Sequence, residues 1–164
     1  MRNRTALVAL VAAIVLASGG LALAQLHAAK TALTTQDYVE IQQLYARYVM
    51  TIDSGDAEGW ANTFTPDGVF NNNSRGHAAL VQFVHDWRDK RNGGDRRHWN
   101  SNLMITPTED GAAGAVYLLL LDISTKPPAP VTSAVYEDAL VKTPQGWRFK
   151  TRVLHSDPAP KRTQ

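Results

Sequence analysis

The chain has 164 residues, a formal net charge of +2, 44% hydrophobic residues and no cysteine. If an N-terminal export signal is set aside, the remaining length fits one domain with one hydrophobic core. The absence of cysteine excludes disulfides and a thiol nucleophile. Arg2 and Arg4 supply two of the positive charges, so the rest of the chain is close to neutral and indicates no nucleic-acid partner.

The first 24 residues have the layout of an export signal. The two arginines precede an apolar run from Ala6 to Ser18, and Ala22-Leu23-Ala24 forms a small-residue cleavage site. We therefore predict a signal peptide over 1–24, a linker over 25–34, and a mature protein that is periplasmic or secreted and does not contact the membrane. A permanent N-terminal membrane anchor is the alternative, because the apolar run is nearly long enough to span a bilayer.

Three helices are predicted first along the chain. From Thr35 to about Ser54, apolar residues recur at helical spacing, and Thr34 or Thr35 is available as the N-cap. A short second helix lies in "DAEGWANTF", where Asp56 caps the start, and the third runs from about His77 to Lys90. Between them, "TPDGVF" is expected to turn through Pro66-Asp67-Gly68 into a short strand.

Four strands follow the helices, separated by polar connections rich in Gly or Pro. They are predicted over His98–Thr106, Ala113–Ser124, Val131–Lys142 and Gly146–Ser156. Because the predicted helices come first in the chain and the antiparallel strands follow, we predict one α+β domain over 35–156. A loose tail is expected over 157–164. The apolar run "AVYLLLLDI" predicts an outer sheet face that another subunit covers, in a homodimer or homotrimer.

Asp53 and His98 are the candidate chemical pair. Asp53 stands at the C-terminal end of the first helix, where the helix dipole disfavours a negative charge, and His98 opens the first long strand. If the sheet folds over this helix, the two side chains meet in the space between them. A carboxylate bonded to one imidazole nitrogen fixes the tautomer and makes the other nitrogen a stronger general base. The alternatives are a turn role for Asp53 and an ordinary strand-end histidine.

An ordered set of segments resembles the SnoaL-like branch of the nuclear transport factor 2-like superfamily. The segments are "LYARYVMTIDSGDAEGWANTFTPDGVF", Gly76 opening a helix, "RHWNSNLMI" and "GWRF", and the resemblance covers about Thr35 to Ser156. It implies a cone-shaped roll in which three N-terminal helices pack on a curved, mostly antiparallel sheet. Within the superfamily, the chain looks like the scytalone dehydratase, bile-acid dehydratase and hexachlorocyclohexane dehydrochlorinase group, whose members abstract a proton with an Asp–His dyad.

The resemblance implies three catalytic residues. Asp53 matches the dyad aspartate, and His98 matches the dyad histidine because "HWNSNL" shares the family's H-x-x-x-N-L arrangement. Tyr48 matches a position that carries tyrosine in the bile-acid enzyme, although it also fits the core stripe of the first helix. The chain departs from the scytalone enzyme at Ile52, where that enzyme has tyrosine. It also lacks that enzyme's second histidine on a late strand.

Trp60, Asn102 and Val49 are the predicted substrate-binding residues. Asn102 follows His98 by four positions, so both are expected on one strand face. Packing in the core is the alternative for Trp60. The histidines of the chain show no metal-ligand spacing, and no phosphate-binding loop is present, so neither a metal nor a cofactor is predicted.

The sequence thus predicts a cofactor-independent lyase or isomerase for a small apolar or cyclic substrate. His98 would remove a proton, Asp53 would orient the imidazole, and Tyr48 would donate a proton to a departing oxygen. The alternative is a non-catalytic module for ligand binding or assembly, because this fold also carries pockets and dimer faces without chemistry. A hydrolase such as an epoxide hydrolase is a weaker third hypothesis, since more than one cavity carboxylate is expected there.

Overall fold

The computed structural model describes residues 32–90 and 95–158. The predicted signal peptide, nearly all of the linker, and residues 159–164 of the predicted tail lie outside the described residues, so export stays a prediction. Among the residues that are described, no helix combines the length and the apolar character needed to cross a membrane.

The first helix, α2 (Thr35–Ser54), begins with a capping box. The Thr34 hydroxyl accepts a hydrogen bond from the Asp37 backbone N–H at 3.2 Å, and the Asp37 carboxylate accepts one from the Thr34 backbone N–H at 2.9 Å. Asp37 also accepts hydrogen bonds from Lys142 Nζ at 2.7 Å and from Trp147 Nε1 at 2.9 Å. Of the two predicted caps, Thr34 is therefore the one used, and the capping box also ties the helix to the sheet.

The other two predicted helices are present as α3 (Ala57–Ala61) and α4 (His77–Asp89). Asp56 caps α3 as predicted, because its carboxylate accepts a hydrogen bond from the backbone N–H of Gly59 at 2.8 Å. The two helices pack against each other, and α4 also contacts the first two strands.

The segment between α3 and α4 differs from its prediction. The strand β1 (Phe64–Phe70) begins before the predicted turn at Pro66-Asp67-Gly68 and continues through it, with an irregular register against its neighbour. A two-residue strand that the sequence did not indicate, β2 (Ser74–Arg75), pairs with β1 in the antiparallel sense. A pair this short shows too little alternation to be recognised in a sequence.

The four predicted strands are all present, close to their predicted bounds, in a six-stranded sheet of order β2-β1-β6-β5-β4-β3. Neighbours among the last four pair in the antiparallel sense, whereas β1 pairs with β6 in parallel, so the sheet is mostly antiparallel as expected. The strands are β3 (Arg96–Thr108), β4 (Gly111–Asp122), β5 (Ala129–Thr143) and β6 (Gly146–Ser156).

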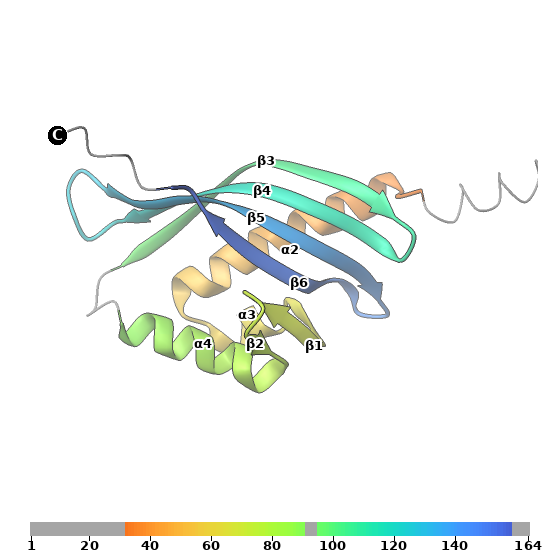
Figure 1. Cartoon of the computed structure of the whole chain (residues 1–164), viewed down its shortest axis with the longest axis horizontal. Helices are drawn as coiled ribbons and strands as arrows, with labels where there is room; N and C mark the ends of the chain where they lie inside the picture. Colours follow the sequence, from red (N-terminus) through yellow and green to blue (C-terminus); the bar gives the residue numbers. More distant parts are fainter. Residues whose placement is uncertain (1–31, 91–94, 159–164) are drawn as a thin grey trace, which may run out of the picture. The chain divides into compact units, whose positions relative to one another are not determined.

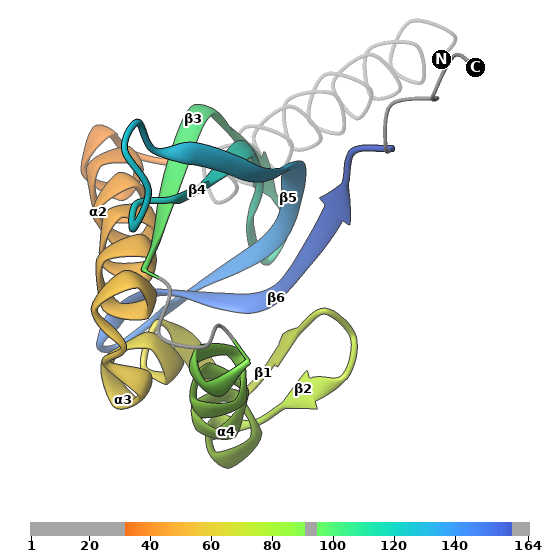
Figure 2. The same ribbon diagram turned by 90° about the vertical axis from the view of Figure 1, so that its left-hand side faces the viewer.

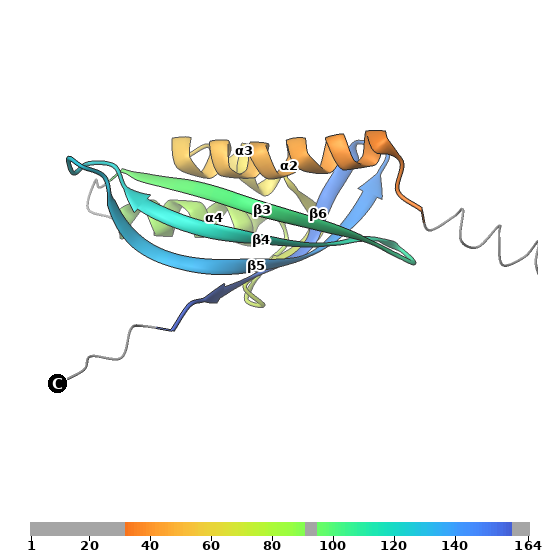
Figure 3. The same ribbon diagram turned by 90° about the horizontal axis from the view of Figure 1, so that it is seen from above.

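Helix α2 bridges the curve of this sheet. It contacts β3 at one edge and β6 beyond the two intervening strands, and Figure 3 shows it running along the strands. Helices α3 and α4 lie together with β1 and β2 below the long strands (Figure 1), and the end-on view in Figure 2 shows the strands curving beside α2. This arrangement is the predicted α+β roll.

Aromatic rings fill much of the space between α2 and the sheet. Tyr48, Trp60, Phe64 and Phe149 are all buried, and neighbouring ring centroids among them lie 5.0 to 6.2 Å apart. Such contacts favour tilted and edge-to-face rings, and these four rings are arranged in that way. The helix is therefore held against the strands by close packing as well as by its capping box.

Substitution of Asp37 by Asn tests the tie between the capping box and the sheet. The Lys142 ammonium, followed by the Thr34 donors, holds the pKa of the Asp37 carboxyl well below its ordinary value of 3.8. Since folding lowers this pKa, the carboxylate stabilises the fold above about pH 4 and loses that contribution as the pH falls through the folded pKa. We expect Asp37→Asn to lower the free energy of unfolding by about 1 kcal/mol at pH 7.

Urea denaturation at pH 7 and at pH 3 measures this effect, which should be smaller at pH 3. Asp89→Asn is the matched control, because Asp89 is exposed at the end of α4 and is expected to contribute little at either pH. An equal loss of stability at both pH values for Asp37→Asn would contradict the ionic contribution.

Candidate functional site

The structure brings Asp53 and His98 together. Nδ1 of the imidazole lies 2.6 Å from Asp53 Oδ1, and the His98 backbone N–H donates to Asp53 Oδ2 at 3.1 Å. Asp53 belongs to the last turn of α2 and His98 to the first half of β3, so packing of the helix on this edge strand makes the contact. The two side chains are 10% and 4% exposed, respectively, which shields the pair from most water.

Side chains from α4 and β3 surround this dyad. The Trp87 ring packs beside the imidazole, with their centroids 5.4 Å apart. Arg97 Nε lies 3.6 Å from Asp53 Oδ2, and the Arg88 guanidinium covers Gly55, the C-cap of α2. A carboxylate at a helix C-terminus is disfavoured by the dipole, and these two cations offset that penalty. The contacts to Nδ1 leave Nε2 as the ring nitrogen without a bond to the described residues.

A groove of about 430 Å³ lies between α2 and β3 beside the dyad. Val49 and Asn102, two of the predicted substrate-binding residues, line it together with Asn100. Val49 precedes Asp53 by one helical turn, and Asn100 follows His98 by two residues on the strand. Because such positions share one face of a helix or a strand, the dyad lies next to residues that line the groove, although neither Asp53 nor His98 is itself among them.

The predicted position of Asn102 on the same face as His98 is wrong. The register of β3 against β4 shifts at this point, and Asn102 has a positive φ of 57°, so the strand carries a bulge there. The extra residue reverses the alternation, and after the bulge it is Leu103 that faces the core. Asn102 is consequently exposed in the wall of the groove.

Asn100 was missed in the sequence analysis. Neither atom of its side-chain amide has a hydrogen-bond partner among the described residues, although both atoms are buried. An unpaired buried polar group typically costs about 1 to 3 kcal/mol, so the groove holds a donor and an acceptor suited to a ligand. Counting two residues from His98 along the strand could have placed Asn100 on the inner face, but not shown that its amide lacks a partner.

Arg152 was also missed, and it is completely buried. Its Nη1 donates to Asp138 Oδ2 at 3.1 Å, and the same carboxylate oxygen accepts from the Tyr45 hydroxyl at 2.5 Å. Its Nε and Nη2 have no partner among the described residues. Its Cζ lies 3.8 to 5.0 Å from the centroids of four aromatic rings, those of Tyr45, Tyr48, Tyr136 and Phe149.

The charges in this interior cluster follow from burial and proximity. Burial raises the pKa of the Asp138 carboxyl, against the opposing effect of Arg152. Burial lowers the pKa of the Arg152 guanidinium, but Asp138 and the surrounding tyrosines outweigh that effect and raise it overall. Burial also raises the pKa of the Tyr48 hydroxyl. The interior therefore contains a permanent cation beside a hydroxyl that stays protonated.

Tyr48 and Trp60 lie deeper than their predicted roles require. Tyr48 is 0% exposed and lies beside Arg152, and its ring packs edge-on against that of Tyr136. Trp60 is also 0% exposed, stacks on Phe83, and is not among the residues that line the groove between α2 and β3. This placement favours the packing alternative for Trp60. Within the described residues, no cluster of acidic or histidine side chains could hold a metal ion.

The curved sheet and the bridging helix form an α+β roll with the cystatin-like fold of nuclear transport factor 2-like proteins. Residues 33–153 match the SnoaL-like domain family, and the chain belongs to that family. No curated protein matches the chain.

Solved structures agree with this assignment. Rv3472 of Mycobacterium tuberculosis, a protein of unknown function, is 30% identical over 79% of this chain and 81% of its own, with a TM-score of 0.69. ActVI-ORFA from Streptomyces coelicolor is 26% identical over 76% and 98% of the two chains, with a TM-score of 0.68. A Catenulispora acidiphila protein solved in complex with S-DNPA is 28% identical over 76% and 96%, also with a TM-score of 0.68.

Removal of the Asp138 charge tests the interior ion pair. Asp138→Asn leaves the buried Arg152 cation without its counter-charge, and we expect the free energy of unfolding to fall by about 3 to 5 kcal/mol. Adding Arg152→Met removes the stranded cation and should recover most of that loss. Glu137→Gln, on the exposed face of the same strand, should change stability by less than about 0.5 kcal/mol. Urea denaturation measures all three variants, and a double variant no more stable than Asp138→Asn would contradict the pairing.

Proposed function

We propose that the protein is a cofactor-independent lyase or isomerase that abstracts a proton from a small cyclic or apolar substrate. The observation that carries the proposal is the shielded 2.6 Å contact between His98 Nδ1 and Asp53 Oδ1. Asp53 holds the Nδ1–H tautomer, so Nε2 is the basic nitrogen, and the carboxylate stabilises the imidazolium that forms.

The remaining unpaired polar groups suit the charge that develops on the substrate. When His98 takes the proton, the C–H electron pair becomes a double bond, and negative charge moves to a carbonyl oxygen or a leaving group. Arg152 Nε and Nη2 are buried donors without a hydrogen-bond partner among the described residues, and donors of this kind stabilise such a charge. The Asn100 amide orients the substrate along the groove, with Val49 and Asn102 in its wall.

The tautomer of His98 tests the dyad without knowledge of the substrate. Long-range ¹H–¹⁵N NMR on the full chain should show His98 as the Nδ1–H tautomer when it is neutral, because Asp53 accepts that hydrogen. In Asp53→Asn the preference should be lost, whereas the solvent-facing His85 serves as an internal control that does not change. A His98 tautomer that is the same in both proteins would contradict the proposed geometry.

Turnover decides between catalysis and binding alone. For a substrate found by screening cyclic hydroxylated compounds, His98→Asn is expected to lower kcat by about 10² to 10⁴. Binding of such compounds without turnover in the wild type would instead support the non-catalytic alternative.

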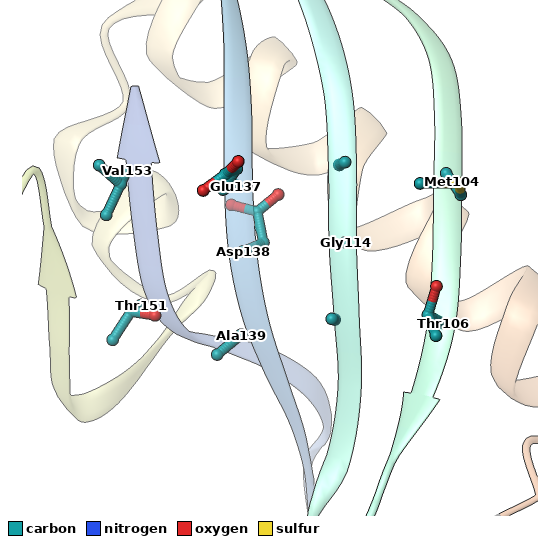
Figure 4. Close-up of a pocket in the computed structure, with 10 residues that line it drawn as sticks. Met104, Thr106, Gly114, Glu137, Asp138, Ala139, Thr151 and Val153 are labelled. Atoms are coloured by element: carbon teal, nitrogen blue, oxygen red, sulfur yellow. The ribbon is translucent and has the colours of Figure 1, made fainter. Parts of the chain in front are cut away.

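We also propose that a second copy of the chain covers the outer sheet face. Trp99, Met104, Tyr117 and Val131 are 48 to 63% exposed on this face. Beside them, small side chains leave a hollow of about 470 Å³. Figure 4 shows its lining residues on four neighbouring strands, with Met104 on β3 at one side and Val153 on β6 at the other. Contiguous apolar surface of this kind marks an interface more often than a solvated face.

Tyr117→Arg tests the dimer by placing a charge in this face. Size-exclusion chromatography with light scattering should give a dimer for the wild type and a monomer for the variant. Met50→Arg is the matched control, because Met50 is 68% exposed on α2, away from the sheet face. A wild-type monomer, or a dimer that Tyr117→Arg leaves intact, would contradict the proposal.

A further inference from the structure

A separate groove, of about 390 Å³, lies between α2 and the turn that joins β5 to β6. From α2 it takes a polar stripe at helical spacing, formed by Gln36, Glu40, Gln43 and Arg47. The sheet contributes Arg148, just after the turn. Most of this stripe belongs to the first half of α2, whereas the dyad is at the end of that helix, so the two sites share no residue.

Two arginines line this groove, and neither side chain forms an ion pair with the described residues. The side chain of Arg47 makes no hydrogen bond or ion pair with the described residues. Arg148 makes one hydrogen bond, from Nη1 to the Trp147 carbonyl at 2.8 Å. Among the described residues, the only carboxylate in the lining belongs to Glu40, and it accepts a hydrogen bond from the Gln36 amide at 3.0 Å.

The surroundings of the Arg148 side chain disfavour its cationic form. Burial lowers the pKa of the Arg148 guanidinium, and the positive charge of Arg47 lowers it further. The hairpin nevertheless keeps this side chain in place, because the neighbouring Trp147 is anchored to Asp37 through Nε1 at 2.9 Å. The other guanidinium N–H groups of Arg148 have no acceptor in the described part of the protein.

We propose that this groove is a binding site for a small oxyanion, a phosphate or a carboxylate, held between Arg47 and Arg148. Guanidinium groups match the geometry of both anions and bind them through paired, charge-assisted hydrogen bonds. The side-chain amides of Gln36 and Gln43 supply further donors in the same groove. The bound anion replaces the repulsion between the two cations by attraction, so binding stabilises the folded chain.

Thermal unfolding of the full chain in inorganic phosphate tests this site, with chloride used to keep the ionic strength constant. The wild-type Tm should rise and saturate with phosphate concentration, whereas Arg47→Gln/Arg148→Gln should bind at least tenfold more weakly. Arg75→Gln/Lys126→Gln removes the same charge from two exposed positions elsewhere and should respond as the wild type does. A repeat with succinate in place of phosphate distinguishes the two anion classes.

Backbone ¹H–¹⁵N NMR locates the site independently of stability. Phosphate or succinate should shift the amide signals of Gly146 and Arg148 in the wild type, and those of β3 around His98 should not move. The absence of a saturable response to either anion, or an equal response in Arg47→Gln/Arg148→Gln, would overturn the proposal. Because the dyad is not involved, neither result bears on the proposed proton abstraction.

Discussion

The packing of α2 across the curved sheet is the constraint on which the rest of the structure depends. Polar contacts join the helix to the strands at its two ends and at its middle: Asp37 to Lys142 and Trp147, Tyr45 to Asp138, and Asp53 to His98. Each contact joins residues that are far apart in the chain, so together they set both the position and the rotation of the helix. The dyad and the groove beside it are products of that placement.

The interior is more polar than packing alone requires. A buried arginine whose carboxylate partner is also buried is costly to desolvate, and removal of both charges is often neutral or stabilising in other proteins. Here the cost is higher, because Nε and Nη2 of Arg152 and both amide atoms of Asn100 lack partners among the described residues. Buried polar groups in native proteins are normally paired with protein groups, ordered water or a ligand. The presence of these unpaired atoms near the groove supports a binding role for the interior.

The long helix, its cap and the four long strands could be predicted because their signals are local. The 3.6-residue period identifies α2, and a turn with glycine at its end precedes β6, whose bounds are as predicted. Predictions failed where a strand is irregular. Bulges at Asn102 in β3 and near Lys150 in β6 reverse the alternation, so Asn102 moved away from the inner face and Arg152 moved onto it.

The sequence by itself determined the α+β order of elements, the SnoaL-like family and the candidacy of Asp53 and His98, since each depends on residue types at fixed spacings. Only the tertiary structure decided that these two side chains touch, that Asn100 lines the groove, and that Arg152 is buried against Asp138. The physical reason is that a side chain's environment depends on strand register and on partners distant in the chain. A single extra residue in a strand changes that environment without changing the pattern around it.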